Sequence, residues 1–411
     1  MMLCAALVFF MHLGFSFLEI GLTRQKNTIN ILFKNFFIIT MGLIAYCLIG
    51  FNLMYPGDFN IIGNGILGFA GPGLDAAVAA DLAYNEGYTY WTDFLFQGMF
   101  AATAGTIISG AVAERIKINS FMLIVLLYVT IVYPIVGSWQ WGSGFLSTLT
   151  DEVGFYDFAG STLVHSVGGW GALIIIYLLG ARKGKFDSSG KPQAIPGSNI
   201  PLSAAGVLIL WLGWFGFNGG SALAANGDAG MAILVTHLSA SAGSLSWMMM
   251  EWRRHGKPSV LGIVTGMVAG LGTITPASGF VGPAGGLVIG FSAGIICYHA
   301  TQAIKQKFHI DDSLDVFPVH GVGGILGTLL AGIFASANIG VFSGQGYNEG
   351  MSMISQVGVQ MIGVFATVSY TALATFIVFK IVNSFVSLRI DDEGELKGLD
   401  LVEHDERGYD L

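Results

Sequence analysis

The chain has 411 residues, of which 53% are hydrophobic and 11% are charged, and its formal net charge is -8. Soluble domains usually have a charged share of about 25%, so this composition excludes an ordinary soluble protein and predicts a membrane protein. The acidic balance, without a basic patch larger than a loop, argues against nucleic acid as a partner. Cys4, Cys47 and Cys297 lie in separate apolar stretches, so neither a disulfide framework nor a zinc site is expected.

The predicted elements are membrane-spanning helices. Such a helix needs about 20 mainly apolar residues, and the first candidate is a span, not a signal peptide, because its positive charges follow it. In chain order the eleven candidates cover residues 3–22, 33–55, 93–113, 118–138, 158–180, 201–222, 229–252, 258–277, 283–304, 313–335 and 351–378. The sequence therefore predicts an all-α polytopic membrane protein, with a membrane domain over residues 1–380 and a tail over residues 381–411.

The positive charges indicate the orientation of these spans. All 18 Lys and Arg residues fall in the odd-numbered connections or in the tail. The even connections hold none, and the first of them, between the second and third predicted spans, carries acidic residues instead: Asp58, Asp75, Asp81 and Glu86. Because Lys and Arg favour the cytoplasmic side, we expect the N-terminus outside and the C-terminal tail in the cytoplasm.

The pattern V-H-x-V-G-G occurs twice, in "LVHSVGGWGAL" at 163–173 and in "PVHGVGGILGT" at 318–328. The first copy lies in the fifth predicted span and the second in the tenth, so the two run in opposite directions across the membrane. This predicts an inverted repeat of spans 1–5 and 6–10, an arrangement that commonly places the functional site near the midplane. We therefore expect His165 and His320 to meet there.

Two neutral imidazoles can hydrogen-bond to each other inside a membrane and still offer a ring nitrogen to a passing proton donor. One alternative is that both histidines only pack between helices. Another is a haem held between them, but the glycines after each histidine favour tight helix contact over a haem cavity, so no cofactor is expected. His12, His237 and His299 have no matching partner and are interpreted as structural.

Polar and aromatic residues gather at the predicted outer ends of several spans. Asp157 lies eight residues, about two helical turns, before His165. It is expected to cap that helix through backbone donors and to attract cations at longer range. The aromatic stretches 96–103, 137–144 and 211–222 form either an interfacial belt or a site that holds a small cation over ring faces.

Six segments resemble the ammonium transporter (Amt) family of the Amt/Rh superfamily, and the resemblance runs from end to end. They are "GFSFLEIGLTRQKN" (14–27), "GAVAERIKINSF" (110–121), "DFAGSTLVHSVGG" (157–169), "GWFGFNGGSA" (213–222), "DDSLDVFPVHGVGG" (311–324) and "GLDLVEHDERGYDL" (398–411). The resemblance implies eleven helices, an outside N-terminus, a pseudo-twofold inverted repeat and a homotrimer with one pore per subunit. There are two departures: His12 stands where many relatives have glutamine or proline, and Asp405 replaces a glycine of the tail, which in the family contacts a neighbouring subunit.

The resemblance also implies roles for individual residues. Phe100, Trp141 and Ser221 match an outer ammonium-recruitment site, with Asp157 in support. Phe100 and Phe217 match the stacked pair that closes the floor of this site. His165 and His320 match the twin histidines of the pore, where proton handling is expected.

The sequence thus predicts an ammonium transporter of a cell membrane, either a bacterial inner membrane or a plasma membrane. The alternative is an ammonium sensor that binds its ligand with little or no flux. A membrane enzyme is not expected, because no nucleophile constellation and no metal-ligand spacing is present. Ammonium and the lipid bilayer are the expected partners, and the resemblance adds a PII-type regulatory protein on the cytoplasmic face.

Overall fold

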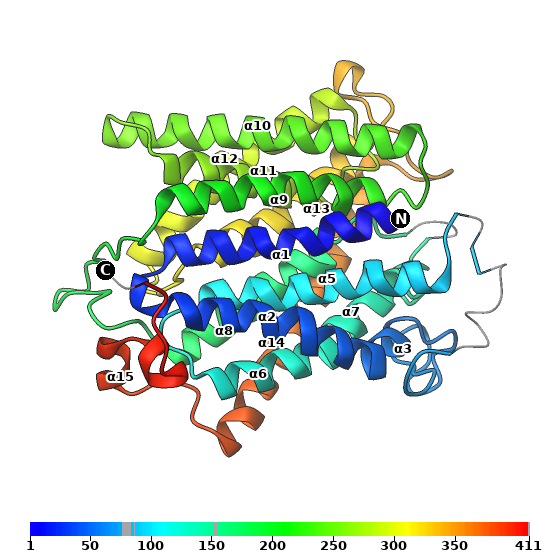
Figure 1. The fold of residues 1–411 in the computed structure, drawn as a ribbon. Helices are drawn as coiled ribbons and strands as arrows, with labels where there is room; N and C mark the ends of the chain where they lie inside the picture. Colours follow the sequence, from blue (N-terminus) through cyan, green and yellow to red (C-terminus); the bar gives the residue numbers. More distant parts are fainter. Residues whose placement is uncertain (76–83, 86, 151–153, 410–411) are drawn as a thin grey trace.

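The computed structural model describes residues 1–75, 84–85, 87–150 and 154–409, so Asp81 and Glu86 lie outside the described residues. Within these ranges the chain forms helices and isolated bridge pairs but no strand. The long helices lie side by side in one bundle, with Met1 toward one end and the short tail helix at the other (Figure 1). The predicted all-α architecture is confirmed.

Each of the eleven predicted segments coincides with one continuous helical run, here called a rod, which can consist of consecutive α- and π-helical elements. The first five rods are α1 (Met2–Leu22), α2 (Thr28–Ala45) with η2 (Tyr46–Gly50) and α3 (Phe51–Met54), α5 (Tyr90–Ala111), α6 (Ile118–Leu127) with η3 (Tyr128–Val132) and α7 (Tyr133–Gln140), and η4 (Ser161–Ser166) with α8 (Val167–Leu179). The others are α9 (Ile200–Gly220), α10 (Gly227–His255), α11 (Val260–Ile274), α12 (Pro283–Gln306), η5 (Phe317–Val322) with α13 (Gly323–Phe334), and α14 (Met353–Phe385). The tail adds α15 (Asp392–Lys397) and η7 (Asp400–His404).

Among the described residues, nine helical runs are long and apolar enough to cross a membrane. The two other rods are neighbours in the chain. The helix α11 has only 15 residues, and α10, with 29 residues, contains the serine-rich stretch "HLSASAGSLS". Length and hydropathy therefore support a multi-pass membrane protein.

The two halves of the bundle meet closely where α1 crosses α9. A Cβ atom on Gly14 would lie 2.9 Å from the carbonyl oxygen of Gly206, and one on Gly206 would lie 2.6 Å from that of Gly14. Such distances leave no room for a side chain at either position. Small residues let helix backbones approach in this way where lipid provides no hydrophobic driving force between helices.

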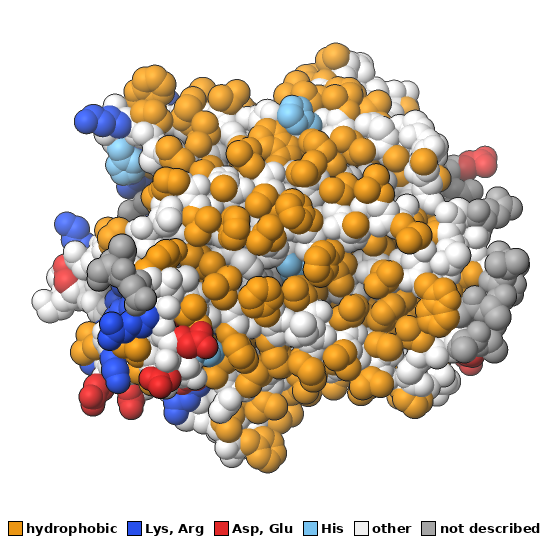
Figure 2. Space-filling view, viewed as in Figure 1, with side chains coloured by type: hydrophobic (Ala, Val, Ile, Leu, Met, Phe, Trp, Pro, Cys, Tyr) orange, Lys and Arg blue, Asp and Glu red, His pale blue; other side chains and the backbone are white. Residues whose placement is uncertain are grey.

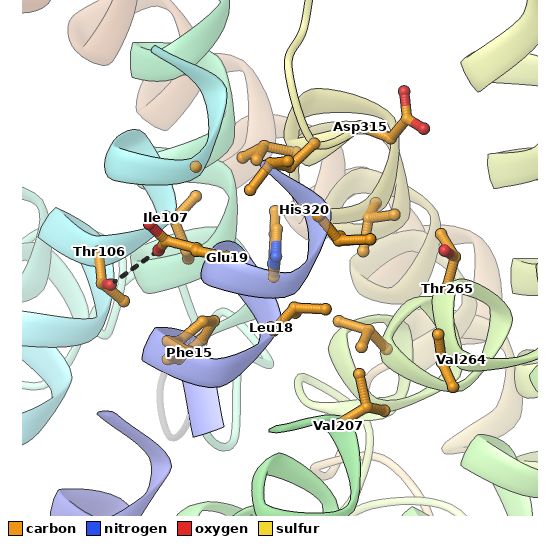
Figure 3. Close-up of a pocket in the computed structure, with 16 residues that line it drawn as sticks. Phe15, Leu18, Glu19, Thr106, Ile107, Val207, Val264, Thr265, Asp315 and His320 are labelled. Carbon is orange, nitrogen blue, oxygen red and sulfur yellow. Dashed lines mark hydrogen bonds between the residues drawn. The ribbon is translucent and has the colours of Figure 1, made fainter. Parts of the chain in front are cut away.

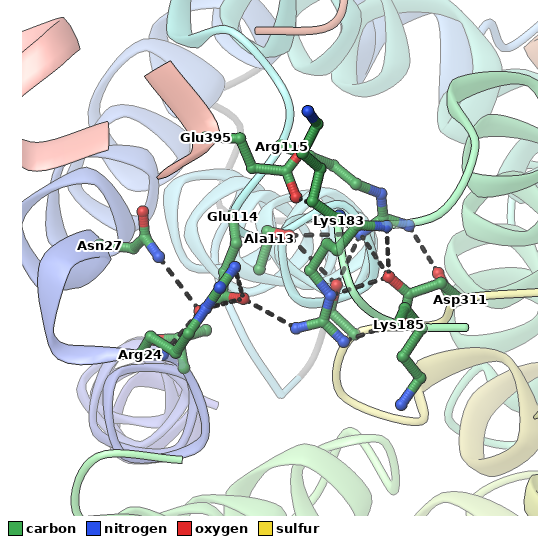
Figure 4. Close-up of polar contacts among 12 residues, drawn as sticks. Arg24, Asn27, Ala113, Glu114, Arg115, Lys183, Lys185, Asp311 and Glu395 are labelled. Carbon is green, nitrogen blue, oxygen red and sulfur yellow. Dashed lines mark hydrogen bonds and ion pairs between the residues drawn. The ribbon is translucent and has the colours of Figure 1, made fainter. Parts of the chain in front are cut away.

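A network of buried charges ties four connections together at the end of the bundle that carries the tail (Figure 4). Glu114 accepts from Arg24 and Arg182, whose nitrogens lie 2.9 Å from its Oε2. Arg182 also holds both carboxylate oxygens of Asp311, at 2.8 and 2.9 Å. Burial raises the pKa of Asp311, but the hydrogen bonds and charge of Arg182, with the charge of Arg115, outweigh burial and hold this pKa well below its usual range.

The tail docks beside this network on the same chain. The amide of Leu399 donates to Asn27 at 3.0 Å, and the side chain of Asp400 accepts from the Asn30 amide at 2.9 Å. Asp405 has φ of +52°, a left-handed conformation that glycine adopts freely and aspartate tolerates better than most residues. The replacement of glycine by Asp405 is therefore compatible with the turn that ends the tail motif.

Asp311→Asn should destabilise the protein, because it leaves the Arg182 guanidinium buried without its full counter-charge. Breaking a buried ion pair costs about 3 to 5 kcal/mol. The pKa of Asp311 is lower in the folded than in the unfolded state, so its stabilisation is complete above the unfolded value of about 3.9 and is lost as pH falls through the folded value.

Thermal unfolding of purified protein in detergent measures this effect. We expect a lower melting temperature for D311N at pH 7, and a smaller further loss on acidification than in wild type. The exposed Asp58→Asn serves as the control. A D311N protein that melts like wild type would show that the network does not stabilise the fold.

Candidate functional site

The two histidine segments have the same local structure. His165 lies in η4 and His320 in η5, and each of these is a π-helical turn that leads into the following α-helix. Such turns are rare and occur frequently at functional sites. Both rings are buried, their Nδ1 atoms are 3.2 Å apart, and their planes are inclined by 21°. In a hydrogen bond between these atoms, one ring must donate and the other accept.

The glycines of the repeated pattern make this pairing sterically accessible. A Cβ atom on Gly169 would overlap the backbone of Gly321, and one on Gly324 would overlap the side chain of Ser166. Gly169 and Gly324 occupy the same position in the two copies of V-H-x-V-G-G, and so do Ser166 and Gly321. The crossing is therefore reciprocal, as a twofold axis between the copies would make it.

Asp157 fixes the start of the first histidine segment. Its Oδ1 accepts from the backbone amides of Gly160 and Ser161 at 2.9 and 2.8 Å, and its Oδ2 from those of Thr162 and Leu163 at 2.8 and 2.9 Å. Four backbone donors would otherwise be buried without partners, which is costly in an apolar interior. The contacts of Asp157 are thus those of a helix cap. An attraction of cations at longer range stays a prediction.

A series of aromatic rings runs from the half-buried Trp141 to the histidine pair. Trp141 packs edge-on against Phe100 with ring centroids 5.9 Å apart. Phe100 stacks on Phe217 at 3.9 Å, with the ring planes within 14° of parallel. The Phe217 ring lies 5.6 Å from His165, which pairs with His320. The structure thus brings five of the predicted site residues into one continuous column.

Ser221 lies directly after α9. Because it follows Phe217 in the chain, we place it toward the end of the column that carries Trp141. Its hydroxyl is half-buried and donates to the Phe217 carbonyl oxygen at 2.9 Å, so its own oxygen can still accept a hydrogen bond. Trp214 was not singled out from the sequence, yet its ring stacks on His165 at 5.1 Å and its Nε1 donates to Thr275. The sequence feature that could have identified Trp214 is its position one helical turn before Phe217 on α9.

A cavity lies against His320 of the histidine pair (Figure 3). Its volume is about 50 Å³, its walls are mainly apolar, and His320 forms part of them. Glu19, Thr106 and Asp315 add polar groups to this wall. Glu19 was not predicted as a site residue, although a carboxylate inside the apolar run 3–22 is itself a functional signal. The described residues contain no group of His, Cys, Asp and Glu that could hold a metal ion.

These features place the chain in a class of multi-pass membrane proteins that have a column of aromatic rings packed against a buried histidine pair. The Ammonium Transporter Family model matches residues 1–409. An ammonium transporter of Aquifex aeolicus is 38% identical and is matched over 100% of this chain and 92% of its own. Amt1 of Archaeoglobus fulgidus is also 38% identical, with 98% and 96% covered.

Solved structures agree with these sequence matches. A protein named Sensor Amt Protein is 33% identical, with a TM-score of 0.88 and coverage of 98% of this chain and 96% of that one. Mep2 of Saccharomyces cerevisiae is 30% identical, with a TM-score of 0.81 and coverage of 95% and 86%. The chain belongs to the ammonium transporter family, whose members are membrane transporters of ammonium and not enzymes.

Gly169→Ala should disturb the crossing at the histidine pair, because the added methyl overlaps the Gly321 backbone, which cannot rotate away. Overpacking of this kind costs about 1 to 3 kcal/mol. The matched control is Gly358→Ala in α14, where the same methyl would meet no atom within 4 Å. Melting temperatures in detergent should fall for G169A only. Equal melting of the two variants would mean that the crossing tolerates a side chain.

Proposed function

We propose that this protein transports ammonium across a cell membrane. In this proposal Phe100, Trp141 and Ser221 recruit the ion at an outer site, the stacked pair of Phe100 and Phe217 closes the floor of that site, and His165 and His320 handle the proton in the pore. The observation that carries the proposal is the continuous column of rings from Trp141 to the histidine pair. Membership of the ammonium transporter family supports the choice of substrate.

The chemistry of the column suits an ion that can lose a proton. An ammonium ion can exchange water for aromatic faces, which is worth about 0.5 to 2 kcal/mol for each cation–π contact, and for the Ser221 hydroxyl. Beyond the closed stack the path is lined by buried rings, where a charged species is costly and a neutral one is not. Ammonium can meet this constraint by giving up a proton. Potassium has a similar charge and size but no proton to give.

The topology of the transporter is part of the proposal. All eleven rods cross the membrane, with the N-terminus outside, a membrane domain over residues 1–380 and a cytoplasmic tail over 381–411. In the view of Figure 2, hydrophobic side chains cover the middle of the molecule and Lys and Arg gather at the end that carries the tail, as expected for a cytoplasmic end. The reciprocal crossing at Gly169 and Gly324 supports an inverted repeat.

The assembly and regulation are proposed from the family alone. The resemblance favours a homotrimer in which each subunit has its own pore. It also favours a PII-type regulatory protein as a partner of the cytoplasmic face. Asp157 has a proposed second effect in recruitment, in which its negative charge acts through the protein on the cation at the outer site while its oxygens remain bound to the backbone.

Uptake into proteoliposomes tests the proposed transport. Purified protein in sealed vesicles should take up ammonium and methylammonium in a saturable way, and potassium should not compete. A binding isotherm measured on the same preparation separates transport from sensing. Saturable binding with no flux above that of empty vesicles would show a sensor and would overturn the proposal.

Replacing either histidine of the pair should damage the same function, because each ring fixes the tautomer and orientation of the other. We expect His165→Ala and His320→Ala each to lose most selective ammonium flux, and the double variant to be little worse than the poorer single one. His165→Glu should admit potassium, since a carboxylate also tolerates a bare cation. His237→Ala, at an exposed histidine, should keep wild-type flux. Normal selectivity in a well-folded double variant would exclude proton handling by the pair.

A further inference from the structure

We propose that Glu19 gives a proton to ammonia in the cavity on the inner side of the histidine pair, and so converts it to ammonium before release. The inner side is the side of His320 that faces away from the stack of Phe100 and Phe217. This inference rests on the proposed transport function. It assigns to the cavity a substrate, ammonia, and to a buried carboxyl group a part in the reaction.

Glu19 and His320 line the same cavity (Figure 3). The Glu19 side chain leaves α1 toward α2 and α5 and is almost completely buried, with 3% of its surface exposed. Its Oε2 accepts from the Ser109 hydroxyl at 2.8 Å and from the Asn35 amide at 3.4 Å. Its Oε1 lies 3.4 Å from the Thr106 hydroxyl. These partners are neutral groups, so none of them forms an ion pair with the carboxyl group.

No ion pair among the described residues includes Glu19. A buried lysine nevertheless lies nearby: Lys34 donates to the Ser109 carbonyl oxygen at 3.0 Å, and Ser109 uses its hydroxyl to bind Glu19. The positive charge of Lys34 can therefore offset the carboxylate once its proton has left. A direct ion pair would have held Glu19 permanently charged, and the intervening serine avoids this.

The other titratable groups of the cavity are His320 and Asp315. Asp315 is already in an ion pair with Lys305 and is partly exposed, so it marks the open rim of the cavity. His320 uses Nδ1 for the pair with His165 and is the nearer route for a proton that comes from the outer side. Among these groups, Glu19 combines burial, access to the cavity and a nearby counter-charge.

The proposed step is a single proton transfer. The lone pair of ammonia takes the proton from the Glu19 carboxyl group, so an O–H bond breaks, an N–H bond forms, and ammonium and a carboxylate result. Ammonium then leaves past Asp315. The carboxylate regains a proton through His320, namely the proton that ammonium lost at the outer site. Over one cycle the protein returns to its starting state and one ammonium ion has crossed.

Glu19→Gln tests this step, because the amide keeps the size of the side chain and one accepting oxygen but cannot give up a proton to ammonia. General acid catalysis contributes about 100-fold or more, so we expect ammonium flux into proteoliposomes to fall by at least about ten-fold. Glu251→Gln is the matched control, since Glu251 lies at the end of α10 and does not line the cavity. Melting temperatures establish that the variants are folded. A folded E19Q protein with wild-type flux would overturn the assignment.

Infrared difference spectra give a second readout that needs no flux. Ammonium chloride added to wild-type protein at constant pH should reduce the carbonyl band of a protonated carboxyl group, and Glu19→Asp should shift that band. An unchanged band in wild type would overturn the assignment, even if E19Q fails to fold. If wild-type vesicles show no ammonium flux, the proposed function fails, while the band still decides whether ammonia and Glu19 exchange a proton.

Discussion

The close crossing of two helical rods at Gly169 and Gly324 is the contact on which the site depends. Because neither position has a side chain, the π-helical turns η4 and η5 pass near enough for the rings of His165 and His320 to form a hydrogen bond. A larger residue would separate the turns before the rings could meet. The same geometry places one face of His165 against Trp214 and leaves His320 facing the cavity.

Within this apolar bundle, the polar groups of the candidate site differ in the kind of partner that they bind. Asp157 binds four backbone amides, which keep its oxygens away from the path. The histidines bind each other and leave Nε2 of His165 without a partner among the described residues. Glu19 binds hydroxyl and amide groups and forms no ion pair within the part of the chain that the structure describes.

Much of the fold follows from the sequence because a membrane imposes a simple rule. Every backbone polar group must be satisfied within the chain, so a long apolar run has to be a helix, and the eleven predicted segments coincide with eleven rods. The proximity of His165 and His320 could also be predicted from the sequence, because two matching segments that run in opposite directions suggest a twofold axis between them. Neither inference required knowledge of side-chain packing.

The rest of the site depends on tertiary contacts that no local pattern contains. Trp214 belongs to an aromatic run in which each ring could face lipid, and only packing selects it as the partner of His165. Glu19 has no neighbour in sequence that explains it, because Ser109, Asn35 and Thr106 come from α2 and α5. The predicted span 351–378 ends before the helix does, because α14 continues to Phe385 through the exposed polar residues Lys380, Asn383 and Ser384.

The reciprocal crossing of η4 and η5 has a consequence for vectorial movement. In the proposed inverted repeat, the backbone presents the same arrangement to either face of the membrane, so the backbone alone favours neither direction of movement. Any rectification must come from side chains that break this symmetry. In the proposed path, the aromatic stack lies toward one end, and Glu19 and Asp315 lie toward the other. In the proposed transporter, any difference between inward and outward movement therefore depends on these few side chains and not on the course of the helices.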